Sequence, residues 1–414
     1  MEGKLSKFSL SLKPSPIQEL SHLAQRCNAI NLAEGFPDFP APHDIKLAAI
    51  NAINADYNQY RHVQGICDQL AEMIKQKHGI DVDPHKNIAI CCGQSEAFAA
   101  AVFATINLRD EVLLFDPAYE TYGACITMAG GVPVYVPLDP PHWTLNLELF
   151  VGSFTSRTKA IVVNSPHNPT GKVFTTDELA AIAQVCCDKD CLAITDEVYE
   201  YITFDLAKHI SLASFPGMAE RTIITSSLSK TYSVTGWRVG WAIASTPIAS
   251  AIKNIHVKLT DSAPAPFQEA ALIALRSSPS FFEHLKTEYE ERRDTIVKIL
   301  REAGFKVHFK PQGSFFVFAE LPEHCVLPDV DFVAELIKKA GVAAVPGCGF
   351  FHESRVLRKG ISSDSLVSGE MPKPYQNYEK RYVRFAFCKS SATLEAAAQK
   401  LNQFVITNEH EEPH

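Results

Sequence analysis

A lysine and an arginine lie eight positions apart in a stretch of small, hydroxyl-bearing residues. Residues 227–230 read Ser-Leu-Ser-Lys, and residues 236–240 read Gly-Trp-Arg-Val-Gly, which places the two side chains at Lys230 and Arg238. A lysine amine can form a Schiff base with a carbonyl compound. An arginine can bind a phosphate through paired, charge-assisted hydrogen bonds. Together they suit a ligand that carries both an aldehyde and a phosphate.

Three short apolar runs each end in polar residues. Ala-Ile-Val-Val at 160–163 precedes Asn-Ser-Pro-His-Asn-Pro-Thr-Gly at 164–171. Ala-Ile-Thr at 193–195 precedes Asp196, and Ile-Ile-Thr-Ser at 223–226 leads to the lysine segment. Such runs are typical of buried strands, and open α/β sheets bind their ligands at the carboxyl ends of strands. The sequence therefore predicts a ligand site at one edge of a sheet.

Pyridoxal 5′-phosphate (PLP) carries an aldehyde and a phosphate, and the order of the motifs resembles that of the class I, fold-type-I PLP-dependent aminotransferases. The similarity extends from about Ile30 to Phe404. Segments 31–39 (Asn-Leu-Ala-Glu-Gly-Phe-Pro-Asp-Phe) and 58–60 (Asn-Gln-Tyr) resemble the kynurenine aminotransferase and glutamine–phenylpyruvate transaminase branch. The resemblance implies transfer of an amino group from an L-amino acid (aromatic, sulfur-containing or glutamine-like) to a 2-oxo acid.

The resemblance implies catalytic roles for Lys230, Asp196 and Tyr199. Lys230 is expected to hold the cofactor as a Schiff base and then to move the substrate α-proton as a general base. Asp196 is expected to keep the pyridine nitrogen protonated, although an aspartate after a strand also serves as a helix N-cap. Tyr199 and Asn168 are expected to donate to the ring's phenolate oxygen, although Asn-Pro also favours turns regardless of chemistry.

The remaining cofactor contacts are expected at one helix N-terminus, at Ser227 and Arg238, and at two tyrosines. Gly93, Gln94 and Ser95 precede or open a predicted helix, whose N-terminal amides favour an anion. By resemblance, Ser227 and Arg238 complete the phosphate site. Tyr119 is expected to stack on the pyridine ring, unless it is an ordinary core aromatic. Tyr60 matches a tyrosine that relatives extend to the phosphate of a neighbouring subunit, so the resemblance implies a C2 homodimer with shared active sites.

Substrate recognition is expected at Arg384, which lies in an apolar strand-like segment, Tyr-Val-Arg-Phe-Ala-Phe at 382–387. A buried guanidinium needs a carboxylate partner, and the substrate α-carboxylate is the functional candidate beside a protein carboxylate. Asn164, Asn168 and the backbone of Gly35 are further candidates for the same carboxylate.

Several positions depart from the kynurenine branch. Ala263 and Pro264 align with positions where relatives carry an aromatic residue and a histidine, and Ile17 with a tryptophan position. Glu34 stands where relatives often have glutamine, adding a charge beside the carboxylate site. We expect a side-chain pocket that accepts a different amino acid, larger or partly polar, so kynurenine specificity does not carry over.

Composition excludes several other classes. The net charge of −8 argues against a nucleic-acid partner, which calls for a basic face. The sequence has no apolar run near the length of a membrane span. Eleven irregularly spaced cysteines suit a reducing compartment, so a cytoplasmic location is expected. The absence of a Cys-x-x-Cys pair predicts no metal site.

The alternation of strands and helices predicts an α/β fold with a mostly parallel, seven-stranded-type sheet and a smaller α+β domain. We expect an N-terminal arm and small-domain segment (1–44), a large PLP-binding domain (45–300) and a C-terminal small domain (301–414). Helices are predicted at 95–103 and 283–301 and antiparallel strands at 305–309 and 313–318. The polar segment 354–380 is expected to be mobile, as neutral surface or a lid.

Two other activities fit the same motifs. A PLP-dependent β-elimination (carbon–sulfur) lyase shares the chemistry up to loss of the α-proton, and an aminocyclopropane-forming lyase shares the core motifs. A non-catalytic regulatory protein on this fold usually carries a fused DNA-binding segment, which the sequence lacks. Transamination is the favoured prediction.

Overall fold

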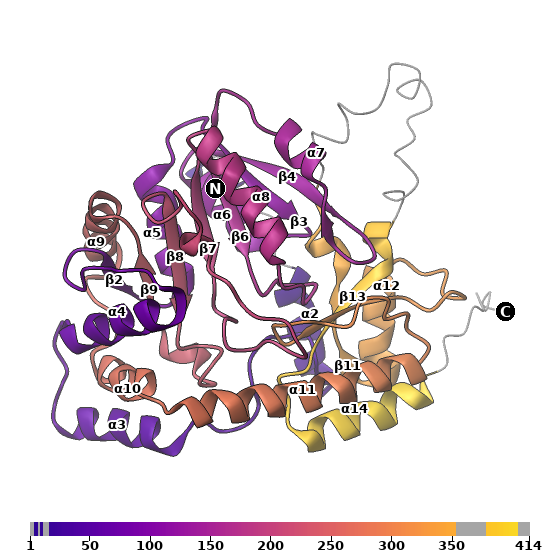
Figure 1. Cartoon of the computed structure of the whole chain (residues 1–414). Coiled ribbons are helices and arrows are strands. Elements are labelled where there is room, and N and C mark those ends of the chain that lie inside the picture. Colours follow the sequence, from indigo (N-terminus) through magenta and orange to yellow (C-terminus); the bar gives the residue numbers. More distant parts are fainter. Residues whose placement is uncertain (1–3, 7–8, 11–15, 353–377, 405–414) are drawn as a thin grey trace.

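The computed structural model describes residues 4–6, 9–10, 16–352 and 378–404. An eight-stranded sheet with helices on both faces occupies one side of the molecule, and a smaller unit with two short sheets occupies the other (Figure 1). The α11 helix, Pro279–Glu302, runs along the base of both (Figure 1). No helix in the described part of the chain is both long and apolar enough to cross a membrane.

The large sheet confirms the predicted α/β class. Strands β8, β7, β6, β3 and β4 are parallel to one another, whereas β9 runs antiparallel to both β2 and β8. A two-residue antiparallel strand, β5, extends the seven at one edge. The strand order and bounds are β2 Ile88–Cys91, β9 Gly240–Ile243, β8 Thr222–Ser227, β7 Leu192–Asp196, β6 Thr158–Asn164, β3 Glu111–Asp116, β4 Val132–Asp139 and β5 Thr144–Leu145.

Alternating side chains of the buried strands pack on opposite faces of this sheet. In β3, Val112 and Leu114 join a cluster with helices α5, α6 and α9, whereas Leu113 and Phe115 join one that includes α8. Because both faces are covered, these strands are apolar throughout, as parallel strands usually are. The helices are α3 His43–Asn54, α4 Gln64–His78, α5 Gln94–Thr105, α6 Glu120–Met128, α7 Leu147–Gly152, α8 Thr176–Asp188, α9 Thr246–Thr260 and α10 Ala265–Leu275.

The smaller unit combines the two ends of the described chain. A three-stranded antiparallel sheet has the order β10, β13, β12, and β1 pairs in parallel with β11. The bounds are β1 Ile30–Asn31, β10 Phe316–Glu320, β11 Val342–Ala343, β12 Val345–Pro346, β13 Tyr382–Ala386, α2 Pro16–Arg26, α12 Asp329–Glu335 and α14 Ser391–Gln403. Short 3-10 or π turns lie at Leu212–Ser214, Thr235–Trp237, Leu336–Ala340, Gly347–Gly349 and Tyr378–Arg381.

The two predicted helices are present, as α5 and α11, each slightly longer than expected. The predicted strand at 305–309 is wrong, since only Lys306 forms an isolated bridge, to Glu320. The predicted strand at 313–318 begins at Phe316 instead, because Ser314 has a φ of 60° and donates its amide to Ile202. Residues 353–377 of the expected mobile segment lie outside the described residues.

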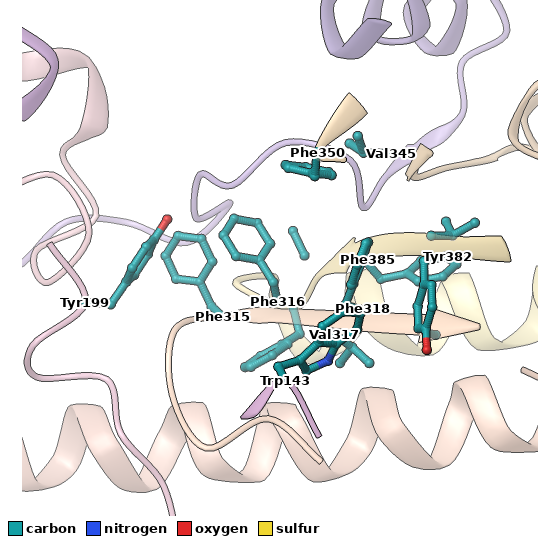
Figure 2. Packing of buried hydrophobic residues seen from close by; sticks show 14 of the residues in the cluster. Trp143, Tyr199, Phe315, Phe316, Val317, Phe318, Val345, Phe350, Tyr382 and Phe385 are labelled. Atoms are coloured by element: carbon teal, nitrogen blue, oxygen red, sulfur yellow. The ribbon is translucent and has the colours of Figure 1, made fainter. Parts of the chain in front are cut away.

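Aromatic rings at the start of β10 connect the two units. Figure 2 shows Phe315 and Phe316 side by side, facing Tyr199, which follows β7 of the large sheet. The centroid of the Tyr199 ring lies 5.0 Å from that of Phe315 and 6.1 Å from that of Phe316. Edge-to-face contacts of this kind favour one relative orientation of the rings, so they align β10 with the edge of the large sheet.

Candidate active site

The carboxyl ends of β6, β7 and β8 place the predicted site residues at one sheet edge. Asn164, the last residue of β6, lies beside Asp196, the last residue of β7, and Asp196 lies beside Thr225 of β8. The chain leaves β8 at Ser227 and reaches Lys230 three residues later. Neighbouring parallel strands end together, so motifs far apart in sequence meet at this edge.

A cavity of about 310 Å³ opens at this edge, between the large sheet and the smaller unit. It brings together most of the predicted site residues. Its wall includes Gly35, Gln94, Ser95, Tyr119, Asn168, Asp196, Tyr199, Ser227, Lys230, Arg238 and Arg384. The wall also contains residues that sequence reasoning did not assign to it, including Phe36, Glu120, Tyr122, Val198, Ser229, Thr235 and Phe316.

Asp196 is buried at the floor of the cavity. Its carboxylate accepts hydrogen bonds from the Tyr122 hydroxyl at 2.6 Å and from the Val198 amide at 3.2 Å. Burial raises the pKa of Asp196 to about 6, and the hydrogen bond from Tyr122 opposes that rise. The carboxyl group is therefore ionised at neutral pH. Tyr122 was missed because it lies on a helix far from Asp196 in sequence.

Lys230 faces the smaller unit across the cavity. Its Nζ donates to the carbonyl oxygen of Gly35 at 3.1 Å and lies 5.7 Å from the ring centroid of Phe315. Burial lowers the pKa of the Lys230 amine to about 8, because a low-dielectric environment disfavours the charged form. A sizeable fraction of this amine is therefore neutral, and hence nucleophilic, near neutral pH.

Two glycines let Arg238 reach the N-terminus of α5. Gly93 has a φ of 82°, and a Cβ there would lie 2.4 Å from an Arg238 guanidinium nitrogen. A Cβ on Gly240 would lie 2.6 Å from the Gln94 amide nitrogen. Arg238 also donates to the Thr235 carbonyl oxygen at 2.9 Å. A guanidinium, hydroxyls and helix amides thus converge in one corner, which suits a phosphate.

Arg384, on β13, is buried in the opposite wall. It donates to Asn168 Oδ1 at 2.9 Å and to the Ala33 carbonyl oxygen at 2.8 Å, while its Nε has no hydrogen-bond partner among the described residues. Its guanidinium carbon lies 4.1 Å from the ring centroid of Phe316. Burial lowers the pKa of Arg384 to about 10, so the side chain stays charged at neutral pH. A cation without a carboxylate partner in a cavity wall is suited to an anionic ligand.

Tyr199 and Tyr119 complete the wall next to Asp196. Burial raises the pKa of the Tyr199 hydroxyl well above its ordinary value, so the hydroxyl remains protonated and can donate a hydrogen bond. The Tyr119 ring lies edge-on to that of Tyr122, with centroids 5.6 Å apart. Both rings border the cavity.

A buried lysine supports the segment that carries Gly35. Lys389 donates to the carbonyl oxygens of Glu34 and Phe36, at 3.2 Å and 2.9 Å. The Glu34 carboxylate borders the cavity and accepts from Asn31 Nδ2 at 2.7 Å. The sequence offered no signal for Lys389, because its partners are backbone atoms.

Some predicted residues lie outside this cavity. Asn164 holds the turn after β6, with its amide group bonded to Asp196 O and to the Asn168 amide. Tyr60 is 77% exposed and borders a different cavity, together with Ala263. Pro264 lies at the start of α10, and the side chain of Ile17 lies outside the described residues.

The donor set fits PLP. Among the described residues, the buried Arg384 has an Nε without a hydrogen-bond partner, Lys230 has an amine of lowered pKa, and Arg238 lies against Gly93 at the start of α5. These groups provide for a carboxylate, an aldehyde and a phosphate, respectively. Asp196 adds an anion for a ring nitrogen.

Comparisons with known proteins agree with this geometry. The family model for class I and II aminotransferases matches residues 28–362. A probable N-succinyldiaminopimelate aminotransferase of Mycobacterium tuberculosis is 36% identical over 389 residues, covering 93% of this chain and 94% of the relative. The kynurenine–oxoglutarate transaminase of Dictyostelium discoideum is 34% identical over 426 residues, covering 96% of each chain.

Solved structures give the same result. The N-succinyldiaminopimelate aminotransferase from Mycobacterium tuberculosis has a TM-score of 0.87 at 35% identity, with 96% of this chain and 99% of that chain covered. The Escherichia coli protein described as having a methionine aminotransferase function has a TM-score of 0.86 at 31% identity, with 97% and 99% covered. This chain therefore belongs to the class I and II aminotransferases, a family of PLP-dependent enzymes.

Proposed function

We propose that the cavity transfers an amino group from an L-amino acid to a 2-oxo acid, with the cofactor attached to Lys230. When bound, PLP supplies an aldehyde for the amino group and a protonated ring that withdraws electrons from the substrate α-carbon. The observation that carries the proposal is the convergence of Lys230, Asp196 and Arg384 on one cavity. The reaction requires three groups: an amine nucleophile, a carboxylate that faces the ring nitrogen, and a cation that binds the substrate carboxylate.

Lys230 acts at Nζ in two steps. Its amine would hold the cofactor aldehyde, and the lowered pKa increases the neutral fraction that can do so. The same Nζ would serve as the general base for the substrate α-proton. The carbonyl of Gly35, 3.1 Å from Nζ, orients the amine before the cofactor is attached.

Asp196 would keep a proton on the ring nitrogen of the cofactor. Tyr199 and Asn168 would donate to its phenolate oxygen, and Tyr119 would pack against the ring. The buried Asp196 carboxylate faces little water, so its attraction for a ring N–H⁺ is strong. Its hydrogen bond from Tyr122 fixes the orientation of the carboxylate.

The phosphate binds in the corner formed by Gly93, Gln94, Ser95, Ser227 and Arg238. Backbone amides at the N-terminus of α5 point into this corner and carry the positive end of the helix dipole. Arg238 adds a full charge there, and the glycine at position 93 leaves room for its guanidinium.

Arg384 would bind the substrate α-carboxylate through Nε, which has no hydrogen-bond partner among the described residues. Asn168 Oδ1 accepts from its Nη1, which holds the fork in place, and the backbone of Gly35 lies in the same wall. A charge-assisted pair of this type contributes about 1.5–3 kcal/mol. Asn164 acts on the carboxylate only through the turn that carries Asn168.

The amino donor is an aromatic, sulfur-containing or glutamine-like amino acid. The phenylalanine and tyrosine rings around the cavity suit an apolar or aromatic side chain. Curated relatives are named for N-succinyldiaminopimelate, kynurenine, methionine and aspartate, so family membership leaves the donor open. Glu34 and Glu120 border the same cavity and disfavour an additional carboxylate on the substrate.

The proposed enzyme is a homodimer of this chain. The side chain of Tyr60 is 77% exposed, and apolar Leu47, Ile50 and Ile53 on α3 are about half exposed. An apolar surface of this kind favours burial against a partner. In a C2 dimer Tyr60 would reach the partner's phosphate site. Light scattering of the holoenzyme should give twice the chain mass of 45.7 kDa, and a monomeric mass contradicts the shared site.

The chain divides into an N-terminal arm and small-domain segment (1–44), a large domain (45–300) and a C-terminal small domain (301–414). The pairing of β1 with β11 supports the assignment of the first segment to the small domain. All eleven cysteines are free, which supports a location in the reducing cytoplasm.

A half-reaction screen tests the proposed activity. Purified holoenzyme is mixed with single L-amino acids, and the near-visible absorption of the cofactor is followed while oxo acid, pyruvate and ammonia are assayed. We expect specific amino acids to convert the cofactor to its amine form and to leave the matching oxo acid. Pyruvate and ammonia without conversion of the cofactor would indicate β-elimination instead, and holoenzyme without cofactor absorption would contradict the role of Lys230.

A further inference from the structure

Three side chains with metal-binding groups meet behind the sheet edge that carries Asp196. His78 is the last residue of α4, Glu197 follows the end of β7, and His209 lies in the segment between β7 and β8. Each offers one ligand atom within 4.8 Å of the other two. The cluster belongs to neither the cavity wall nor the proposed reaction.

The three ligand atoms lie near enough to one another to share an ion, and one pair is at hydrogen-bonding distance. Glu197 Oε2 lies 2.7 Å from His209 Nε2, and the His78 and His209 rings are edge-to-face with centroids 5.8 Å apart. In a tetrahedral zinc site with bonds of about 2.1 Å, ligand atoms lie about 3.4 Å apart. Binding of an ion would require the Glu197 and His209 atoms to separate from 2.7 Å to this spacing, and the His78 atom, which lies within 4.8 Å of both, to approach it.

Each of the two histidines has one buried ring nitrogen that is unused. His78 Nε2 and His209 Nδ1 have no hydrogen-bond partner in the described part of the chain. The His209 side chain is only 2% exposed and that of Glu197 4%. Buried polar atoms nearly always have a partner, and a bound ion would supply one for His78 Nε2.

Neighbouring hydroxyls hold the Glu197 carboxylate. Its Oε1 accepts from Thr195 Oγ1 at 2.9 Å and from Ser211 Oγ at 2.8 Å. The other oxygen, Oε2, is directed at His209. Outer hydrogen bonds of this kind orient the ligands of metal sites and raise their affinity.

Space for a fourth ligand lies next to the cluster. A cavity of about 30 Å³ has His78 and Glu197 in its wall, which is sufficient for one water molecule. Lys77 and Glu200 also border this cavity, and they are paired with each other at 2.6 Å, so the lysine charge is offset.

We infer that His78, Glu197 and His209 bind one zinc ion per chain, with a water as the fourth ligand. Two imidazoles and a carboxylate, without thiolate, form a donor set that zinc accepts. The ion would connect the C-terminal end of α4 and the segment around His209 to the end of β7, and so stabilise the strand that carries Asp196. The sequence patterns predicted no metal site, because the three ligands come from separate segments.

The test uses chelator-treated holoenzyme and Zn²⁺ alone. Equilibrium dialysis is run on the wild type, on His78→Gln, which lacks one ligand, and on His85→Ala, which lacks an exposed histidine outside the cluster. We expect one tight equivalent per chain in the wild type and in His85→Ala, and at least tenfold weaker binding in His78→Gln, since loss of an outer hydrogen bond alone costs about 10–100-fold. The bound PLP is the same in all three proteins and cancels in the comparison.

Binding that is equal in the wild type and His78→Gln, or absent from both, would overturn the inference. If His78→Gln does not fold, Co²⁺ added to the wild type replaces that comparison. A four-coordinate site gives strong absorption bands in the visible range, at longer wavelength than the cofactor. Weak six-coordinate bands only would also overturn the inference.

Discussion

The two walls of the active-site cavity are built in different ways. The wall formed by the large sheet takes Asp196 and Lys230 from neighbouring strand ends, and the Asp196 carboxylate already has protein partners. The wall formed by the smaller unit takes Gly35 and Arg384 from segments at opposite ends of the chain, and Arg384 retains an unpartnered nitrogen. One wall is complete without substrate, whereas the other is complete only with an anion bound.

This difference assigns separate tasks to the walls. Satisfied buried groups on a continuous sheet are held in place, which suits a cofactor that stays bound through each reaction cycle. An unpaired buried cation is costly, so binding of a carboxylate at Arg384 relieves that cost. Changes in the first wall should therefore affect chemistry or cofactor, and changes in the second should affect substrate.

Lys230→Ala should have the largest effect. The variant loses both the cofactor attachment and the proton-transfer group, so the half-reaction should slow at least 10³-fold, since general acid–base groups alone contribute about 10²–10⁴-fold. Stopped-flow absorbance of the cofactor measures the rate, with the exposed Lys298→Ala as control. A Lys230→Ala rate within tenfold of the wild type would remove this residue from the chemistry.

Arg384→Lys tests the second wall. It keeps the charge but loses the planar fork, and disruption of a buried charge pair costs about 2–5 kcal/mol. We expect kcat/KM for amino acids to fall about 10²-fold or more, with the affinity for PLP unchanged. Steady-state kinetics and a cofactor titration on the same preparation measure the two effects. Equal losses of kcat/KM and of the affinity for PLP would show that the two walls do not have separate roles.

Tyr122→Phe should shift the pH dependence. The Tyr122 hydrogen bond lowers the pKa of Asp196, so its removal raises that pKa above about 6, and the carboxylate becomes protonated at higher pH. The acid limb of kcat/KM should therefore move upward by about one pH unit, which corresponds to about 1.4 kcal/mol. Tyr289→Phe, which removes a buried hydroxyl without a hydrogen-bond partner among the described residues, is the control. If the acid limb of kcat/KM does not move, this hydrogen bond does not control the pKa of Asp196.

Glu34→Gln should have the smallest effect. The substitution removes a negative charge from the substrate wall but keeps an oxygen that can accept from Asn31. Partly exposed charges contribute about 0.2–1 kcal/mol, so kcat/KM for dicarboxylic amino acids should rise a few-fold relative to that for uncharged ones. The ratio of kcat/KM for dicarboxylic amino acids to kcat/KM for uncharged ones measures the effect. An unchanged ratio would exclude Glu34 from substrate selection.

The sequence by itself determined the first wall. Asn168, Asp196 and Lys230 each lie within a few residues of an apolar run, and the carboxyl ends of parallel strands must share an edge. Local patterns therefore sufficed for the α/β class and for most of the cavity residues. The helices α5 and α11 were equally visible, because the strong helix formers of α5 and the charge-dense turns of α11 each lie within one segment.

Only the tertiary structure decided which distant side chains support these residues. The contacts of Tyr122 with Asp196 and of Lys389 with the backbone around Gly35 join segments that have no pattern in common. The start of β10 was misplaced for the same reason, since the turn at Ser314 is held by a loop of the large sheet. Spacing within one segment follows from strand and helix geometry, whereas contacts between distant segments depend on how the whole core packs.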